Sequence, residues 1–283
     1  MFYTELPPHP SLASHVRCIW VFDSSDPGTS AGDAGSADDT QRIVPDGHPE
    51  LVLHYGDRFA ELGDDNVATT QSRLVFAGQI SRPLVLRPGA KAGVIGVRFH
   101  PAGARALLGM AMMENTDARL DLMSAWGRDS EHLLDEVHSA ADAFARVRVV
   151  ESFLIQRLAQ SRVAADAAVA HCVALLRSAS PPLTIDDLAT QSGLSSRQLE
   201  RRFLQEVGIP PRLLASIFRF RRLFDAVEQE EAAPGRWAGA AFAAGYFDQA
   251  HMIRDFKRFA GQPPQAFYRA LSGLSAAMVG NPP

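Results

Sequence analysis

Two stretches in the last third of the chain decide the fold: LTIDDLATQSGLSSRQLERRFLQEVGIPP at residues 183–211 and AGAAFAAGYFDQAHMIRDFKRFAGQPP at residues 238–264. They share one spacing pattern. Phe203 and Phe256 are each followed by a glycine after five residues and by a proline pair after seven and eight. An A-x-x-x-G segment precedes each phenylalanine. The two stretches are therefore copies of one structural unit.

The first copy predicts a helix, a short turn and a second helix. Thr184 is a preferred helix N-cap, and the acids that follow it favour the positive end of a helix dipole. Gly193 ends this helix because glycine adopts positive φ at little cost. Ser195 or Ser196 then caps the second helix, which we expect to run to about residue 207.

The second copy predicts the same arrangement. Its first helix is WAGAAFAA at residues 237–244, Gly245 forms the turn, and Asp248 caps a second helix that reaches Phe259. A helix from residue 211 to about residue 229 joins the two units. Each unit has the helix-turn-helix pattern, whose second helix fits a major groove about 12 Å wide. Two units that share the same Phe, glycine and proline-pair spacing indicate this fold far more specifically than one unit would.

The paired units resemble the DNA-binding domain of the AraC/XylS family of bacterial transcription regulators. The second copy is similar to the more diagnostic family motif, A-x-x-x-G-[FY]-x-[DS]-x-S-x-F-x-[RK]-x-F-[RK]-x-x-x-G-x-[ST]-P. It departs from that motif at Met252, which replaces Phe, and at Pro263, which replaces Ser or Thr. Ala250 offers no hydrogen bond to a base, so the base preference stays open.

The resemblance places polar residues of the two second helices near base edges. On the first of these helices they lie opposite the apolar pair Leu199 and Phe203, and an arginine there can bind guanine with two hydrogen bonds. The residues predicted to contact bases are Ser196, Arg197, Glu200, Arg201, Gln249, His251, Ile253 and Arg254. The residues predicted to meet phosphates, or else acids, are Arg202, Arg219, Arg222, Lys257 and Arg258. A solvated charged face is the competing interpretation of any one of them.

The net charge of −4 is unevenly distributed along the 283 residues. Residues before 180 include 16 basic and 22 acidic side chains, a balance of −6, whereas the rest include 12 and 10, a balance of +2. Seven arginines fall between residues 195 and 222. The whole-chain charge is therefore no argument against a nucleic-acid partner.

The first half of the chain predicts a strand-rich domain with a helical tail. Short runs rich in β-branched and aromatic residues, each bounded by turn residues, predict strands at 18–22, 49–55, 73–78, 84–89 and 93–99. Helical spacing begins at Pro101 and continues at 130–138 and 145–159. Residues 23–40 have no apolar side chain larger than alanine and predict a mobile loop. The fold class is α+β with two domains, 1–162 and 163–275.

Segments RIVPDGHPELVLHYGD (42–57) and GVRFHPAGARALLG (96–109) resemble the N-terminal domain of one branch of AraC-type regulators. In that family such domains are cupin-like barrels that sense small molecules or mediate dimerisation. The resemblance implies a sequence-specific DNA-binding transcription regulator, with double-stranded DNA as its partner. A small-molecule effector, a homodimer and, for an activator, RNA polymerase are the further partners it implies. Asp46 and Gly47 form a predicted turn.

The alternative function is a cupin-type small-molecule-binding or enzymatic protein whose helical domain does not read DNA. His48, Glu50 and His54, with His100 as a fourth, could be metal ligands, but Pro49 interrupts the strand that carries them. Polar residues at strand ends are the preferred interpretation, so we expect no metal, no cofactor and no catalytic residue.

Two further patterns concern the environment of the protein. Cys18 and Cys172 lie in apolar segments far apart, which indicates packing thiols in a reducing cytoplasm. No segment predicts a secretory signal or a transmembrane helix, so we expect a cytoplasmic protein without a membrane partner.

Overall fold

The computed structural model describes residues 2–24, 40–63, 65, 67–178, 183–229 and 236–269. Residues 25–39 of the predicted mobile loop lie outside these ranges, as do residues 270–275 at the end of the predicted second domain. Within the described ranges, no helix is long and apolar enough to cross a membrane.

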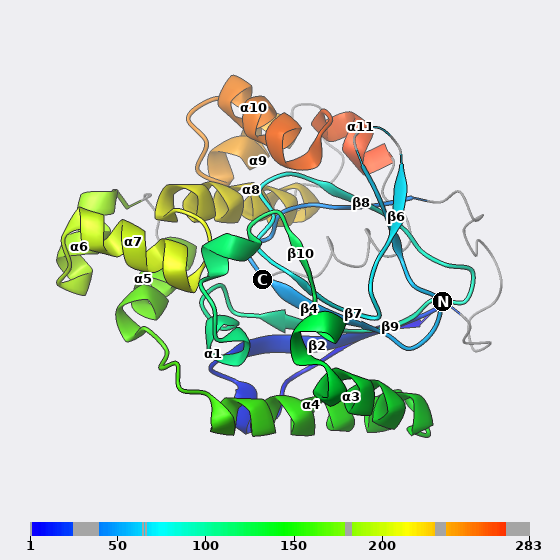
Figure 1. The fold of residues 1–283 in the computed structure, drawn as a ribbon. Helices are drawn as coiled ribbons and strands as arrows, with labels where there is room; N and C mark the ends of the chain where they lie inside the picture. The colour runs from blue at the N-terminus through cyan, green and yellow to red at the C-terminus, as the bar shows by residue number, and fades with distance from the viewer. Residues whose placement is uncertain are drawn as a thin grey trace.

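The N-terminal part contains two antiparallel sheets (Figure 1). The larger sheet, in the order β1-β2-β9-β4-β7-β10, consists of β1 (Phe2–Leu6), β2 (Val16–Asp23), β9 (Gly93–Phe99), β4 (Glu50–His54), β7 (Leu74–Ala77) and β10 (Arg119–Asp121). The smaller sheet, in the order β3-β8-β5-β6, consists of β3 (Gln41–Ile43), β8 (Leu84–Arg87), β5 (Ala60–Leu62) and β6 (Ala68–Thr70). All five predicted strands are present.

The larger sheet is buried on both faces, which explains why β2 is an unbroken apolar run. Successive side chains of a strand point to opposite faces. Ile19 and Val21 therefore pack in the core that the sheet forms with the helical tail. Trp20 and Phe22 pack on the other face, which faces the smaller sheet, in a cluster with Phe59 and Leu86.

The helical tail covers the larger sheet (Figure 1). Its elements and the short helices before it are η1 (Pro10–Leu12), α1 (Arg105–Leu108), η2 (Met112–Asn115), α2 (Leu122–Trp126), α3 (Arg128–Ser139) and α4 (Ala143–Gln160). Helices α3 and α4 confirm the predicted segments at 130–138 and 145–159.

The helix predicted to begin at Pro101 begins four residues later, at Arg105. The reason is a contact with the N-terminal segment. His100 N–H donates to the carbonyl oxygen of His15 at 2.8 Å. A Cβ atom on Gly103 would lie 2.0 Å from that same oxygen. This docking holds residues 100–103 in turns, and a distant contact of this kind leaves no local signal.

The C-terminal part is helical, and its core also includes Val44 of the N-terminal part. Its elements are α5 (Ala167–Ser178), α6 (Ile185–Ser192), α7 (Ser196–Glu206), α8 (Pro211–Gln229), α9 (Arg236–Ala243), α10 (Gln249–Ala260) and α11 (Pro264–Arg269). Phe220 of α8 packs against Phe256 and Phe259 of α10, with ring centroids 5.3 and 5.2 Å apart. Helix α8 thus holds the second unit by aromatic contacts and follows directly from the first (Figure 1).

Candidate nucleic-acid interface

Helices α6 and α7 of the first unit are fixed by capping boxes at both N-termini. Thr184 and Asp187 exchange side-chain and backbone hydrogen bonds at the start of α6, and Ser195 and Gln198 do so at the start of α7. Of the two predicted caps, Ser195 is the one that the structure shows. Each box satisfies N–H groups that a helix end leaves without partners.

Helix α7 has one buried and one exposed face. Leu199 and Phe203 are fully buried in the helical core. Arg197, Glu200 and Arg201 are exposed, and their side chains hold no hydrogen bond or ion pair to another described residue. The predicted base-contacting face is therefore available to a partner. Its remaining member, Ser196, is half-buried, and its hydroxyl donates to Asp186 Oδ1 at 2.8 Å.

Helix α10 has the same division. Asp248 caps it, with its side chain accepting from His251 N–H at 2.6 Å, as predicted. Met252, Phe256 and Phe259 are buried. Of the predicted base-contacting residues, Gln249 and Arg254 are exposed and His251 is half-buried. Ile253 is half-buried and packs against the helical core.

One predicted base-contacting residue of α10 also takes part in an internal network. The guanidinium of Arg219 in α8 lies 3.3 Å from His251 Nε2 and donates to Asp255 Oδ2 at 2.8 Å. The same guanidinium lies 4.8 Å from the centroid of the Tyr246 ring. Burial raises the pKa of Tyr246 above its ordinary value. The network ties the start of α10 to α8.

The basic residues predicted to meet phosphates or acids fall into two groups. Arg202 pairs with Asp166 at 3.3 Å, and Arg219 pairs with Asp255, so both have acid partners. Arg222 donates to the carbonyl oxygen of Arg177 at 3.3 Å. Only Lys257 and Arg258, at the end of α10, are exposed members of this set.

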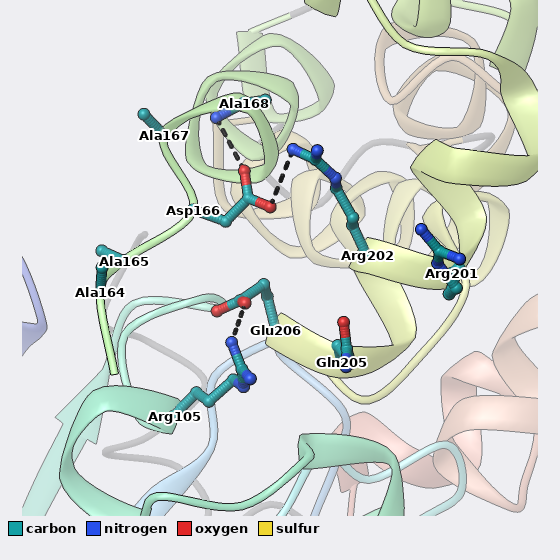
Figure 2. Close-up of a pocket in the computed structure, with 10 residues that line it drawn as sticks. All are labelled: Arg105, Ala164, Ala165, Asp166, Ala167, Ala168, Arg201, Arg202, Gln205 and Glu206. Carbon is teal, nitrogen blue, oxygen red and sulfur yellow. Dashed lines mark hydrogen bonds and ion pairs between the residues drawn. The ribbon is translucent and has the colours of Figure 1, made fainter. Parts of the chain in front are cut away.

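An open cleft of about 800 Å³ lies beside the C-terminal end of α7, where this helix meets the N-terminal part (Figure 2). There Glu206 of α7, which is 4% exposed, forms an ion pair with Arg105 of α1. Burial raises the pKa of Glu206, and the charge of Arg105 opposes that rise. Close by, the Thr116 hydroxyl donates to the carbonyl oxygen of Gly208 at 2.7 Å.

These contacts were not expected from the sequence. Arg105 and Glu206 are 101 residues apart, and neither lies in a motif that marks the other. The helix-turn-helix unit is thus tied directly to the N-terminal part, at the end of α7 opposite its capped N-terminus.

The metal candidates do not converge on one point. His48 Nδ1 lies 2.7 Å from the carbonyl oxygen of Phe99, and His54 Nε2 lies 3.2 Å from Gln71 Oε1. His100 Nε2 lies 3.2 Å from a backbone carbonyl, and Glu50 accepts from Arg98. Among the residues that the structure describes, no group of three or more His, Cys, Asp or Glu is placed to hold a metal ion.

Both cysteines are buried and unpaired. Burial raises the pKa of the Cys18 thiol to about 12 and raises that of Cys172 as well. A thiol reacts as a thiolate, so neither cysteine is activated in this fold.

Two family models match separate parts of the chain. Residues 4–121 match a model described as "Domain of unknown function (DUF6597)", and residues 188–270 match one described as "Helix-turn-helix domain". A search of curated proteins found no match.

Several solved structures are similar to the chain. Apo ToxT from Vibrio cholerae is 12% identical, with 94% of this chain and 100% of that chain covered and a TM-score of 0.49. ToxT from the same organism with unsaturated fatty acid bound is 12% identical, with coverages of 84% and 93% and a TM-score of 0.46. The AraC-like transcriptional activator CuxR is 14% identical, with coverages of 86% and 91% and a TM-score of 0.24.

The helix-turn-helix match and the geometry of α7 and α10 together define a DNA-binding protein. The two units are joined by the single helix α8. The chain has a strand-rich N-terminal domain and a helical C-terminal domain, and its helix-turn-helix match covers most of the residues whose sequence resembles the AraC type.

Proposed function

We propose that α7 and α10, which we call the recognition helices, enter successive major grooves of one DNA site and contact bases through their exposed faces. The observation that supports this most is the repeated division of each helix into a buried apolar face and an exposed polar face with an arginine. The contacting residues are Ser196, Arg197, Glu200, Arg201, Gln249, His251, Ile253 and Arg254. Rigid connection through α8 suits half-sites about 34 Å apart on one face of the duplex.

The proposal extends to the backbone of the DNA. Lys257 and Arg258 contact phosphates, which supplies affinity that falls with salt, whereas base contacts supply sequence preference. Arg202, Arg219 and Arg222 reach phosphates only by giving up the partners described above. Arg202 and Arg219 then serve first to hold α7 and α10 in place.

The experiment is selection of binding sites from a random DNA pool, followed by footprinting upstream of the protein's own gene and of adjacent genes. We expect a bipartite site with half-sites about one helical turn, roughly 10 base pairs, apart. Binding without sequence preference would contradict the proposal. Bound metal in the purified protein, together with no salt-dependent DNA binding, would favour the alternative of a cupin-type enzyme or binding protein.

We further propose that a small molecule held in the N-terminal domain controls DNA binding. We place the boundary between the two domains near residue 162. The support for the boundary is the helix-free segment between Gln160, where α4 ends, and Ala167, where α5 begins. The support for an effector is a cavity between the two sheets, lined mainly by apolar side chains. In full, the proposed protein is a cytoplasmic regulator without enzymatic activity. It acts as a homodimer and, if it is an activator, contacts RNA polymerase.

A further inference from the structure

The cavity between the sheets is small. Its volume is about 60 Å³, and Trp20, Phe59 and Leu86 are among its walls. A space of this size holds a few waters, since one water occupies roughly 10–15 Å³ on this measure. A ligand with more than a few heavy atoms must therefore displace a wall. The wall that moves determines which other elements of the molecule are displaced.

Several walls lie outside the strands, among them Phe59 and Ile80, but one of them also contacts the helical part of the molecule. Val44, Asp46 and His48 line the cavity from the segment between β3 and β4, which we call the 44–48 turn. The ladder pairing of β3 ends at Ile43, and that of β4 begins at Glu50. Moving this turn breaks no ladder hydrogen bond, whereas moving a strand wall breaks several.

The opposite side of the same turn rests on α8. Gly47 has a φ of +83°, and a Cβ atom there would lie 2.9 Å from both Leu214 Cδ1 and Phe218 Cε1 of that helix. Such an approach is closer than a side-chain carbon tolerates. Val44 is buried in the same core cluster as Leu214. The turn therefore has no free space between the cavity and α8.

His48 attaches the turn to a second helix. Its Nε2 lies 3.4 Å from the guanidinium of Arg177 in α5, while its Nδ1 faces the carbonyl of Phe99. The two neighbours require an imidazole that donates at Nδ1 and accepts at Nε2, which is the neutral form. Arg177 in turn lies 5.3 Å from the centroid of the Phe218 ring.

We propose that the 44–48 turn couples occupancy of the cavity to the placement of the two recognition helices. A small, mainly apolar ligand displaces the turn, and the turn displaces α8. Helix α8 follows the first unit directly and packs on α10, so its shift changes the position of α10 relative to α7. This inference rests on the proposed function, because it assumes that both units bind one DNA site.

The test compares Gly47→Ala with Gly109→Ala in the full chain. Both glycines have positive φ, +83° and +74°, but nothing lies within 4 Å of a Cβ atom on Gly109. Both variants place alanine at a positive φ, and only the first pushes on α8. In Gly47→Ala we expect at least tenfold faster hydrogen exchange of α8 amides than in Gly109→Ala. Equal exchange in the two variants overturns the proposal.

DNA binding gives a second measurement. We expect Gly47→Ala to bind a single half-site as wild type does, but to lose at least fivefold of the affinity that the second half-site adds. If the second half-site adds the same affinity in Gly47→Ala as in wild type, the proposed coupling is overturned. If wild type binds no DNA with sequence preference, the proposed function fails instead, and hydrogen exchange of α8 still decides whether the turn pushes on it.

A second pair of variants covers the case in which Gly47→Ala fails to fold. Val52→Ile adds a methyl group at the cavity wall, whereas Val97→Ile adds the same group in the core on the other face of the sheet. We expect Val52→Ile to change the exchange of α8 at least threefold and Val97→Ile to leave it unchanged. Equal effects of the two variants overturn the proposal.

Discussion

Arg201 and Arg254 occupy matching positions, two residues before the buried phenylalanine of each unit, and both are exposed. Replacing either by alanine should lower discrimination between the specific site and random DNA by about 1–3 kcal/mol, because a two-hydrogen-bond contact with guanine is lost. Thermal unfolding should not change. Competition binding measures the ratio, with Arg148→Ala, an exposed arginine of α4, as the control. The base-contact assignment is wrong if neither variant alters the ratio.

Lys257 is expected to contribute to DNA affinity but not to sequence preference. A phosphate contact releases counterions, so Lys257→Ala should reduce the slope of log affinity against log salt by about 0.9 and weaken all DNA sequences equally. Binding measured between low and moderate salt on specific and random DNA checks both statements. Arg148→Ala again serves as the control. A wild-type slope would show that Lys257 faces solvent in the complex.

Two buried histidines make stability depend on pH. Burial lowers the pKa of His48 to about 3 and that of His54 to about 4. An unfolded chain takes up these protons near pH 6.5, so the free energy of unfolding falls as the pH drops from there toward 4, by about 1.4 kcal/mol per unit for each histidine. Denaturation of His48→Gln at several pH values should show a shallower slope. His132→Gln, at an exposed site, should keep the wild-type slope.

At the scale of elements, the caps are the features that define the recognition helices. Ser195→Ala removes the side chain that accepts from Gln198 N–H at the start of α7. It should lower the free energy of unfolding by about 1 kcal/mol. Ser216→Ala is the control, since that hydroxyl bonds back to a helical carbonyl inside α8. Urea denaturation would contradict the capping role if the two variants were equally stable.

The helical elements were largely predictable, because caps, glycine turns and apolar spacing are local signals. Ser195, Gly193 and Asp248 all act where their residue types suggested. Strands β1, β3, β5, β6 and β10 were not predicted. All five residues of β1 are half-buried, the other four strands have three residues each, and β6 is wholly exposed, so none shows an alternating pattern of burial. Their pairing partners are set by the sheet rather than by their own sequence.

The base-contacting face of the candidate site was predictable for the same reason, since burial of Leu199 and Phe203 leaves Arg197 and Arg201 outside. The partners of Arg202 and Arg219 were not. Asp166 directly precedes α5 and Asp255 lies in α10, and each is 36 residues from its arginine. Which arginine meets an acid depends on helix packing, and sequence spacing does not specify it.

At the scale of the whole molecule, the Arg105–Glu206 pair links the two parts of the chain. Arg105→Ala leaves the buried carboxylate of Glu206 without its partner. It should therefore lower the free energy of unfolding by more than the double variant Arg105→Ala/Glu206→Ala does. We expect a coupling energy of about 0.5–3 kcal/mol in a double-mutant cycle measured by denaturation. Additive effects of the two substitutions would mean that the pair contributes nothing to the interface.

The contact between Val44, Gly47 and α8 has a consequence for anyone who dissects this protein. A fragment that starts at residue 163 would lack Val44 and Gly47, and it would expose Leu214 and Phe218, which are 0% and 4% exposed in the whole chain. An uncovered apolar strip of this kind favours self-association. A minimal DNA-binding fragment therefore needs polar replacements on that side of α8 before its solubility, or its DNA affinity, reports on the intact regulator.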